Sequence, residues 1–306
     1  MHALHLLVAA MRLSCWPFEV EGQGQTLTTP PEIAVPPAIS APRPAPLPPK
    51  PPASLPRNEV IRYDIRYGLF GSIGELSVTA GGLTTDPNGA TMVKLRGAGR
   101  GAVLGLGGMQ RRIEAEFDSR ALGSRRWTVG RRKESQRDDE ETVDIGEHNE
   151  RGETHLQRHK PGGPDETQAF RSNLPTSDPL GMIWRFRTAP PALGATDTMH
   201  VLDGLALWQV RATTVSQSDA VPDGTTVAMR LEGEINPVHY DGSPDPGRTG
   251  RKFTLWLDRQ TSHVPLRLEV PVGPSDLVMQ LVEAKNLAET SEPRQLGTPA
   301  PGARSL

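Results

Sequence analysis

The stretch EVIRYDIRY, residues 59–67, decides the fold of this chain. Ile61, Tyr63, Ile65 and Tyr67 alternate with polar residues, and a period of two indicates a strand that buries one face. Residues 68–74 contain three glycines and predict a turn. Residues 75–80 then read as the returning strand of a hairpin, so folding starts from an antiparallel pair.

Short β-like segments continue through the chain, separated by Gly, Pro and Asp turns. Because almost no segment is followed by a long helical pattern, a parallel α/β sheet is disfavoured. We expect a mainly β fold: an antiparallel, strongly curved sheet or half-barrel with one or two short helices, preceded by a disordered Pro-rich segment. The further strands predicted are 90–97, 126–131, 142–145, 153–159, 198–202, 206–216, 225–235, 252–258, 265–270 and 276–283.

Two segments are predicted to be helical. Residues 105–117 carry Met109, Ile113 and Phe117 at four-residue spacing. The second helix begins with better signals, because Ser177 or Asp178 can cap it and Pro179 suits the first helical position.

The second helix should plug or cover the sheet. Leu180, Ile183, Trp184 and Arg187 share one of its faces. Leu180 and Trp184 are therefore expected in the core, and Arg185 and Arg187 at the rim.

The chain divides into three parts. Residues 1–57 are expected to be disordered; they hold a short apolar run at 4–11, a possible degenerate leader, and twelve prolines between positions 30 and 56. Such a proline stretch favours extended polyproline II and acts as a semi-rigid spacer. Residues 58–287 form the β-rich domain, and residues 288–306 a disordered tail.

Composition excludes several functional classes. The formal net charge is −2, so no overall field favours nucleic acid. The one cysteine, Cys15, lies before the domain, which therefore lacks a disulfide, a Cys-based zinc site and a cysteine nucleophile. No segment has the length and apolar character of a transmembrane helix.

Candidate catalytic and metal-binding residues have simpler explanations. Residues 147–159 are rich in His and Glu, but in a hairpin His155 and His159 would lie about 13 Å apart. A cross-strand pair of His148 and His155 stays open, yet solvated polar residues explain the segment better. Ser177-Asp178 with a remote His200 or His263 has the residue types of a hydrolase without any motif, and no cofactor motif is present.

Tryptophans suggest where an apolar ligand could bind. Trp127, Trp208 and Trp256 each lie in a predicted strand, where a ring faces either the core or a groove. If the sheet curls around a cavity, these rings together with Trp184, Ile183 and Met182 would line it. Such a lining suits an acyl chain or another apolar ligand. The candidate ligand-binding residues are Met182, Ile183, Trp184, Trp208 and Trp256.

Several local patterns occur in an order that resembles a known bacterial family. They are the turn GSIGE at 71–75, DPL at 178–180 running into WRFR at 184–187, LG at 193–194, DG at 203–204, LWLD at 255–258 and VPLRLE at 264–269. Over residues 59–285 this resembles domain of unknown function 3108. The resemblance implies an envelope-associated or secreted domain with a curved sheet similar in outline to lipoprotein-carrier folds. The family has no established activity, so it supplies no catalytic residues.

Three functional hypotheses follow. The leading one is a non-enzymatic, periplasmic or envelope-associated domain that binds an apolar ligand such as a lipid, or a protein partner; a cytoplasmic location is the alternative. The second is a structural or assembly scaffold without a ligand, and the third, with least support, is a hydrolase. An apolar cavity under the helix at 178–187 would favour a carrier, and a filled interior would favour a scaffold.

Overall fold

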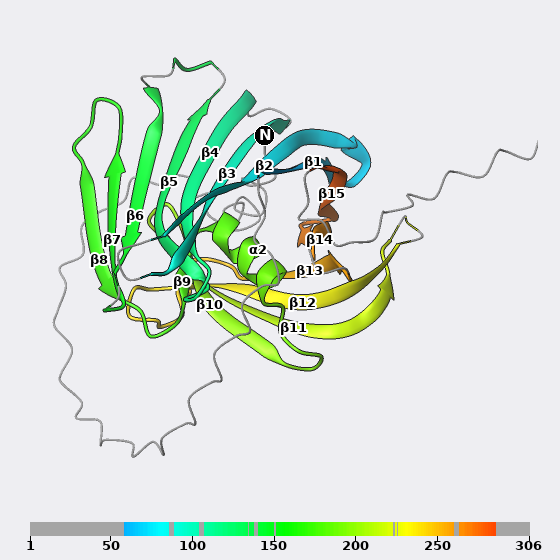
Figure 1. The fold of residues 1–306 in the computed structure, drawn as a ribbon. Helices are drawn as coiled ribbons and strands as arrows, with labels where there is room; N and C mark the ends of the chain where they lie inside the picture. The colour runs from blue at the N-terminus through cyan, green and yellow to red at the C-terminus, as the bar shows by residue number, and fades with distance from the viewer. Residues whose placement is uncertain are drawn as a thin grey trace, which may run out of the picture.

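A computed structural model describes residues 58–85, 89–103, 107–133, 135–137, 140–149, 151–222, 224, 226–259 and 263–285. The predicted segments 1–57 and 288–306 lie outside these residues. Among the described residues, strands form one 15-stranded sheet that curves around a single α-helix (Figure 1). The elements are β1 (Glu59–Tyr67), η1 (Gly68–Phe70), β2 (Ser72–Thr85), β3 (Thr91–Val103), β4 (Gly107–Asp118), β5 (Gly123–Lys133), β6 (Thr142–His148), β7 (Glu153–His159), β8 (Glu166–Arg171), β9 (Thr176–Ser177), α2 (Pro179–Thr188), β10 (Thr196–Asp203), β11 (Ala206–Ala220), β12 (Val227–Val238), β13 (Arg251–Asp258), β14 (Pro265–Val272) and β15 (Ser275–Lys285).

The strand order is that of an open meander. It runs β8 to β1 and then β15 to β9, so the first strand pairs with the last and lies near the middle of the sheet. The β9–β10 pair is parallel, while the other strand pairs between described residues are antiparallel. The sheet ends at β8 and β9 and does not close into a barrel. The prediction of an antiparallel, strongly curved sheet is confirmed.

The core fills the concave side of the sheet. Ile61, Tyr63 and Ile65 on the inward face of β1 are at most 4 % exposed, as the period of two predicts. They belong to one continuous cluster with inward residues of the other strands and with Leu180 and Trp184 of α2. The interior is therefore occupied by protein side chains from both the sheet and the helix.

The helix α2 is fixed at its start by Asp178. One carboxylate oxygen accepts the backbone N–H groups of Leu180 and Gly181, at 2.8 and 3.3 Å, and the other accepts the Ser124 hydroxyl at 2.6 Å. Burial raises the pKa of Asp178, although these hydrogen bonds act in the opposite direction. Asp178 thus caps the helix as predicted and also joins it to β5.

The predicted rim position is wrong for Arg187. Arg187 is 6 % exposed and forms a bidentate pair with Glu59 at the start of β1, while its guanidinium lies 4.6 Å from the Trp184 ring centre. Arg185 binds both carboxylate oxygens of Asp197 and the Leu122 carbonyl. Long arginine side chains reach buried carboxylates, which a helical-face argument does not anticipate.

The helix predicted at 105–117 is also wrong, because the structure has strand β4 over Gly107–Asp118. A spacing of four places Ile113 and Phe117 on one face of a strand as well as of a helix. Two residues before Ile113, on the same inward face, lies Arg111, a buried charge that conceals the alternation. Arg111 is paired with Asp203 of β10, so β4 contributes a long-range ion pair to the interior.

Candidate binding groove

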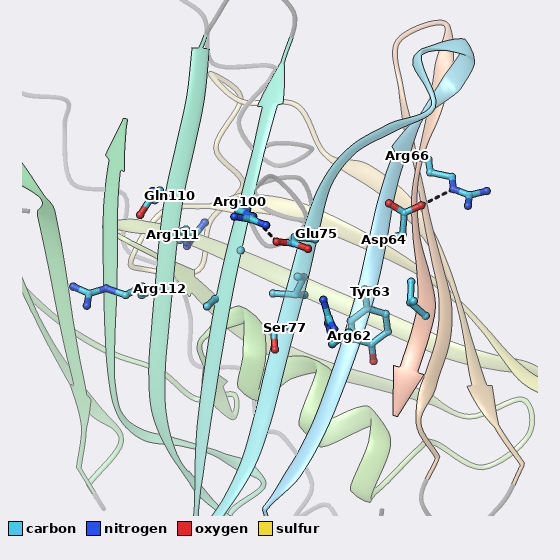
Figure 2. Close-up of a pocket in the computed structure, with 14 residues that line it drawn as sticks. Arg62, Tyr63, Asp64, Arg66, Glu75, Ser77, Arg100, Gln110, Arg111 and Arg112 are labelled. Carbon is cyan, nitrogen blue, oxygen red and sulfur yellow. Dashed lines mark hydrogen bonds and ion pairs between the residues drawn. The ribbon is translucent and has the colours of Figure 1, made fainter. Parts of the chain in front are cut away.

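A groove of about 950 Å³ runs over the outer face of β1, β2, β3 and β4 (Figure 2). Most of its outward-facing side chains come from two cross-strand rows. The first row joins Arg62, Ser77, Ala98 and Arg112 in successive strands. Opposite residues of antiparallel strands point to the same face, so the row has long side chains at its ends and short ones in the middle. The short side chains leave the hollow.

The second row carries charge along the same groove. Asp64 lies opposite Glu75, Glu75 opposite Arg100, and Arg100 opposite Gln110. Arg100 donates through Nε to the Glu75 carboxylate. An apolar contribution comes from Val282 of β15, which lines the groove and is 67 % exposed. The surface therefore combines guanidinium groups with a small apolar side chain.

Asp64 is held as an anion at the end of the groove nearest the β1–β2 turn. Burial alone would raise the pKa of Asp64, but hydrogen bonds from the Ser72 hydroxyl at 2.5 Å and from Arg66 Nε at 2.8 Å outweigh it and lower the pKa. Figure 2 shows Arg66 beside Asp64 and Arg100 beside Glu75. The carboxylates orient the arginines on these strands.

The arginines of the groove are more accessible than their acidic partners. The side chain of Arg112 is 71 % exposed, whereas that of Glu141, its partner at 2.5 Å, is 12 % exposed. Arg100 is 69 % exposed and Glu75 47 %. Exposed pairs of this kind contribute little to stability, so a ligand anion can add to or replace a pair at small cost. The outward-facing arginines of the lining outnumber its carboxylates, Asp64 and Glu75; they are Arg62, Arg66, Arg100 and Arg112.

The groove lacks catalytic machinery among its described residues. Ser77 is the one serine among the lining residues, which include no histidine and no cysteine. A serine needs an adjacent base to act as a nucleophile. Over the described residues, no group of three or more His, Cys, Asp or Glu side chains is placed to hold a metal ion. The arrangement can bind by hydrogen bonds and charge.

Four of the five sequence-predicted ligand residues lie together on the inner side of the sheet. Met182, Trp184 and Trp208 are at most 4 % exposed in the main core, and Ile183 is partly buried against it. Trp127, which like Trp208 lies in a predicted strand, is also in this core. Any contact of these side chains with a ligand stays a prediction, and it would require α2 to move.

Trp256 lies apart from the other four. Its neighbours Leu255 and Leu257 point into the main core, whereas Trp256 points outward and contacts a small cluster of Val221, Ala228 and Leu266. Through strand pairing it lies in the same outer-face row as Asp64, three strands away. Trp256 is 5 % exposed, so other residues cover its side chain and it does not face solvent.

The polar residues considered for metal binding or hydrolysis are kept apart. His148 faces the Thr154 hydroxyl at 2.9 Å, and His155 lies opposite Glu147, so the two histidines do not pair. His200 contacts Ser172 rather than Ser177. The predicted segment 153–159 is a strand, as expected.

Sequence reasoning missed the groove. Arg62 and Asp64 stand in the opening strand as polar alternates, which are ordinarily solvated. The signal is visible only when the register of β1 to β4 is known, because Ser77 and Ala98 then fall between two arginines.

No helix of the described part of the chain is long and apolar enough to cross a membrane.

Comparisons with known proteins identify the family. The family model "Protein of unknown function (DUF3108)" matches residues 62–282, and the chain belongs to this family. This confirms the resemblance seen in the sequence. A comparison with curated proteins finds no match.

A comparison with solved structures gives several matches at low sequence identity. A β-barrel-like protein of domain of unknown function DUF1849 from Brucella abortus is 13 % identical, with a TM-score of 0.49, over 78 % of this chain and 100 % of that one. LprF from Mycobacterium bovis is 9 % identical, with a TM-score of 0.25, over 78 % and 90 %. A protein described as exported, with a YmcC-like fold, from Bacteroides fragilis is 9 % identical, with a TM-score of 0.27, over 75 % and 96 %.

Proposed function

We propose that this member of the DUF3108 family is a non-enzymatic binding domain of the bacterial cell envelope, whose ligand lies in the groove across β1 to β4. The observation that carries the proposal is the groove itself, with arginine side chains at both ends of a row whose centre is Ser77 and Ala98. Guanidinium groups bind carboxylates and phosphates with directed hydrogen bonds. The ligand class is an elongated molecule that bears such anionic groups.

The filled interior leaves the outer face as the place for a ligand, and by the criterion given above it favours the scaffold hypothesis if that face is empty. Leu180, Trp184 and Phe186 of α2 are each at most 4 % exposed within the continuous core. The space under the helix, where an apolar ligand was expected, is thus occupied by side chains. A continuous core of buried side chains supports the sheet, and rigid elements position a binding surface well.

The scaffold hypothesis is the second candidate. Buried ion pairs such as Arg111 with Asp203 and Arg187 with Glu59 connect distant parts of the chain across the interior. Such connections, together with the filled core, would serve a module whose role is to hold others in place. The two candidates differ in whether the outer groove is occupied in cells.

Native mass spectrometry of the full chain purified from a bacterial envelope tests the proposal. We expect a bound ligand with the wild type and its loss from the double variant Arg100→Glu and Arg112→Glu. Arg96→Glu is the matched control: Arg96 is on the same strand and face as Arg100, is 67 % exposed and pairs with Glu114, but does not line the groove.

Each outcome decides between the candidates. A ligand that is retained by the double variant would place binding elsewhere and refute the groove. A wild-type protein that carries no ligand would favour the scaffold. Loss of ligand from the Arg96 variant as well would point to a general effect of charge.

A further inference from the structure

Two neighbouring turns form an uncharged, partly apolar end of the sheet. One is Gly68–Gly71 between β1 and β2, and the other is Val272–Ser275 between β14 and β15; none of their eight residues is ionisable. Leu69 is wholly exposed and Phe70 is 60 % exposed. Figure 2 shows the β1–β2 turn at the end of the sheet beyond Arg66 and Asp64. Two large apolar side chains are seldom exposed to water side by side at one turn.

The exposure of these side chains is fixed by the backbone. Gly68 and Gly71 have positive φ values of 46° and 69°, which favour glycine, and the Tyr67 N–H donates to the Gly71 carbonyl at 3.1 Å. The Tyr67 and Phe70 rings stack with centres 6.0 Å apart. The Tyr67 hydroxyl donates to the Val272 carbonyl at 3.0 Å, which ties the two turns together. A rigid turn loses little conformational entropy when its apolar side chains are buried.

The size and charge of this end indicate what would cover it. Leu69 and Phe70 present far less area than the roughly 800 Å² per partner of a stable protein–protein interface. A lipid surface needs no matching pocket, and an aliphatic side chain beside an aromatic one suits its interfacial layer. The charged residues beside the two turns are Arg66 in β1, Asp276 in β15 and Arg251, which donates to the Pro271 carbonyl. Because both signs are present, attachment would depend on apolar insertion more than on lipid charge.

We propose that Leu69 and Phe70 insert into the interfacial layer of a lipid bilayer and attach the domain to its surface by this end. The contact is peripheral and reversible. It goes beyond the groove proposal and does not depend on it, because none of the groove arginines is required for insertion.

Co-sedimentation of the full chain with phosphatidylcholine vesicles tests the attachment. We expect the double variant Leu69→Ser and Phe70→Ser to lower the partition coefficient about tenfold or more. The matched control, Leu193→Ser with Val227→Ser, removes two other exposed apolar side chains and should change it less than about twofold. Any contribution from residues outside the described ranges is common to all three proteins.

Salt and lipid charge give a second comparison. Adding phosphatidylglycerol or about 0.5 M NaCl should alter wild-type partition little, because charge contributes little to the contact. Equal partition of the wild type and the Leu69/Phe70 variant would overturn the proposal. Binding that salt abolishes, or a wild type that does not bind vesicles, would overturn it as well.

A tryptophan reporter locates the turn directly. Phe70→Trp should give added fluorescence that shifts to shorter wavelength with vesicles and is quenched by lipids brominated on their acyl chains. The wild type, measured in parallel, corrects for its own tryptophans. Added emission that is unchanged by vesicles would show that position 70 stays in water.

Discussion

The buried pair of Glu59 and Arg187 offers a quantitative test of how α2 is held inside the sheet. Glu59 is fully buried, Arg187 is 6 % exposed, and two guanidinium nitrogens bind the two carboxylate oxygens. Removing one partner leaves the other charge buried without its counter-ion, which costs about 3–5 kcal/mol. Glu59→Gln and Arg187→Met should each lower the free energy of unfolding by about this amount.

The double variant distinguishes the contribution of the ion pair from the loss of packing that each substitution causes on its own. Because replacing both charges also removes their desolvation penalty, the double variant should lose clearly less than the sum of the single losses. Equilibrium urea unfolding measures all four proteins, with an unchanged m-value as the check on two-state behaviour. Arg96 and Glu114, both more than two-thirds exposed, form the control pair and should show almost no coupling. Single losses below about 1 kcal/mol, or strictly additive losses, would refute the role assigned to the Glu59–Arg187 pair.

Three further predictions concern stability. Trp256→Ala should cost about 3–5 kcal/mol in urea unfolding because the ring is covered; a loss below about 1 kcal/mol would mean that it is not part of a core. Gly181→Ala should cost about 1–3 kcal/mol, since its Cβ would overlap the hydroxyls of Ser124 and Ser177, whereas Gly99→Ala, which has room, should be close to neutral in the same assay. The free energy of unfolding should also fall as pH decreases from about 7.5 to 5.5, by at most about 1.4 kcal/mol per pH unit for each titrating group; a flat or rising profile would contradict this. The titrating groups are His148, His200 and His263, because burial lowers the pKa of each in the folded protein. In the unfolded chain a histidine has a pKa near 6.5, so as the pH falls the unfolded chain takes up protons before the folded one.

The sequence predicts the fold well because strand alternation is a local property. Ile61, Tyr63 and Ile65 show it without interruption, and the core contains all three. The start of α2 was equally readable, since Asp178 and Pro179 carry a cap signal within two residues. Residues 107–118 were misread because a spacing of four fits both a strand and a helix, and because Arg111 occupies an inward position. The short edge strand β8, Glu166–Arg171, was missed because most of it is exposed and has no buried alternate face.

The candidate site was much less predictable, because a groove depends on register and curvature. Arg112 and Arg62 are 50 positions apart in the sequence and meet in one row only through three strand pairings. Tryptophans were a reasonable guide to burial: Trp184 and Trp208 fill the core, and Trp256 is covered on the opposite face. Their contact with a ligand stays a prediction.

Site-specific photo-crosslinking in bacterial cells tests the groove most directly. A photoreactive residue at Val282, which lines the groove, should capture a ligand or partner, and the same residue at Val227, an exposed valine outside the groove, should not. Arg100→Glu with Arg112→Glu in the same chain should abolish the Val282 product. Equal capture at both valines, or a Val282 product that survives loss of the arginines, would contradict a binding site across β1 to β4.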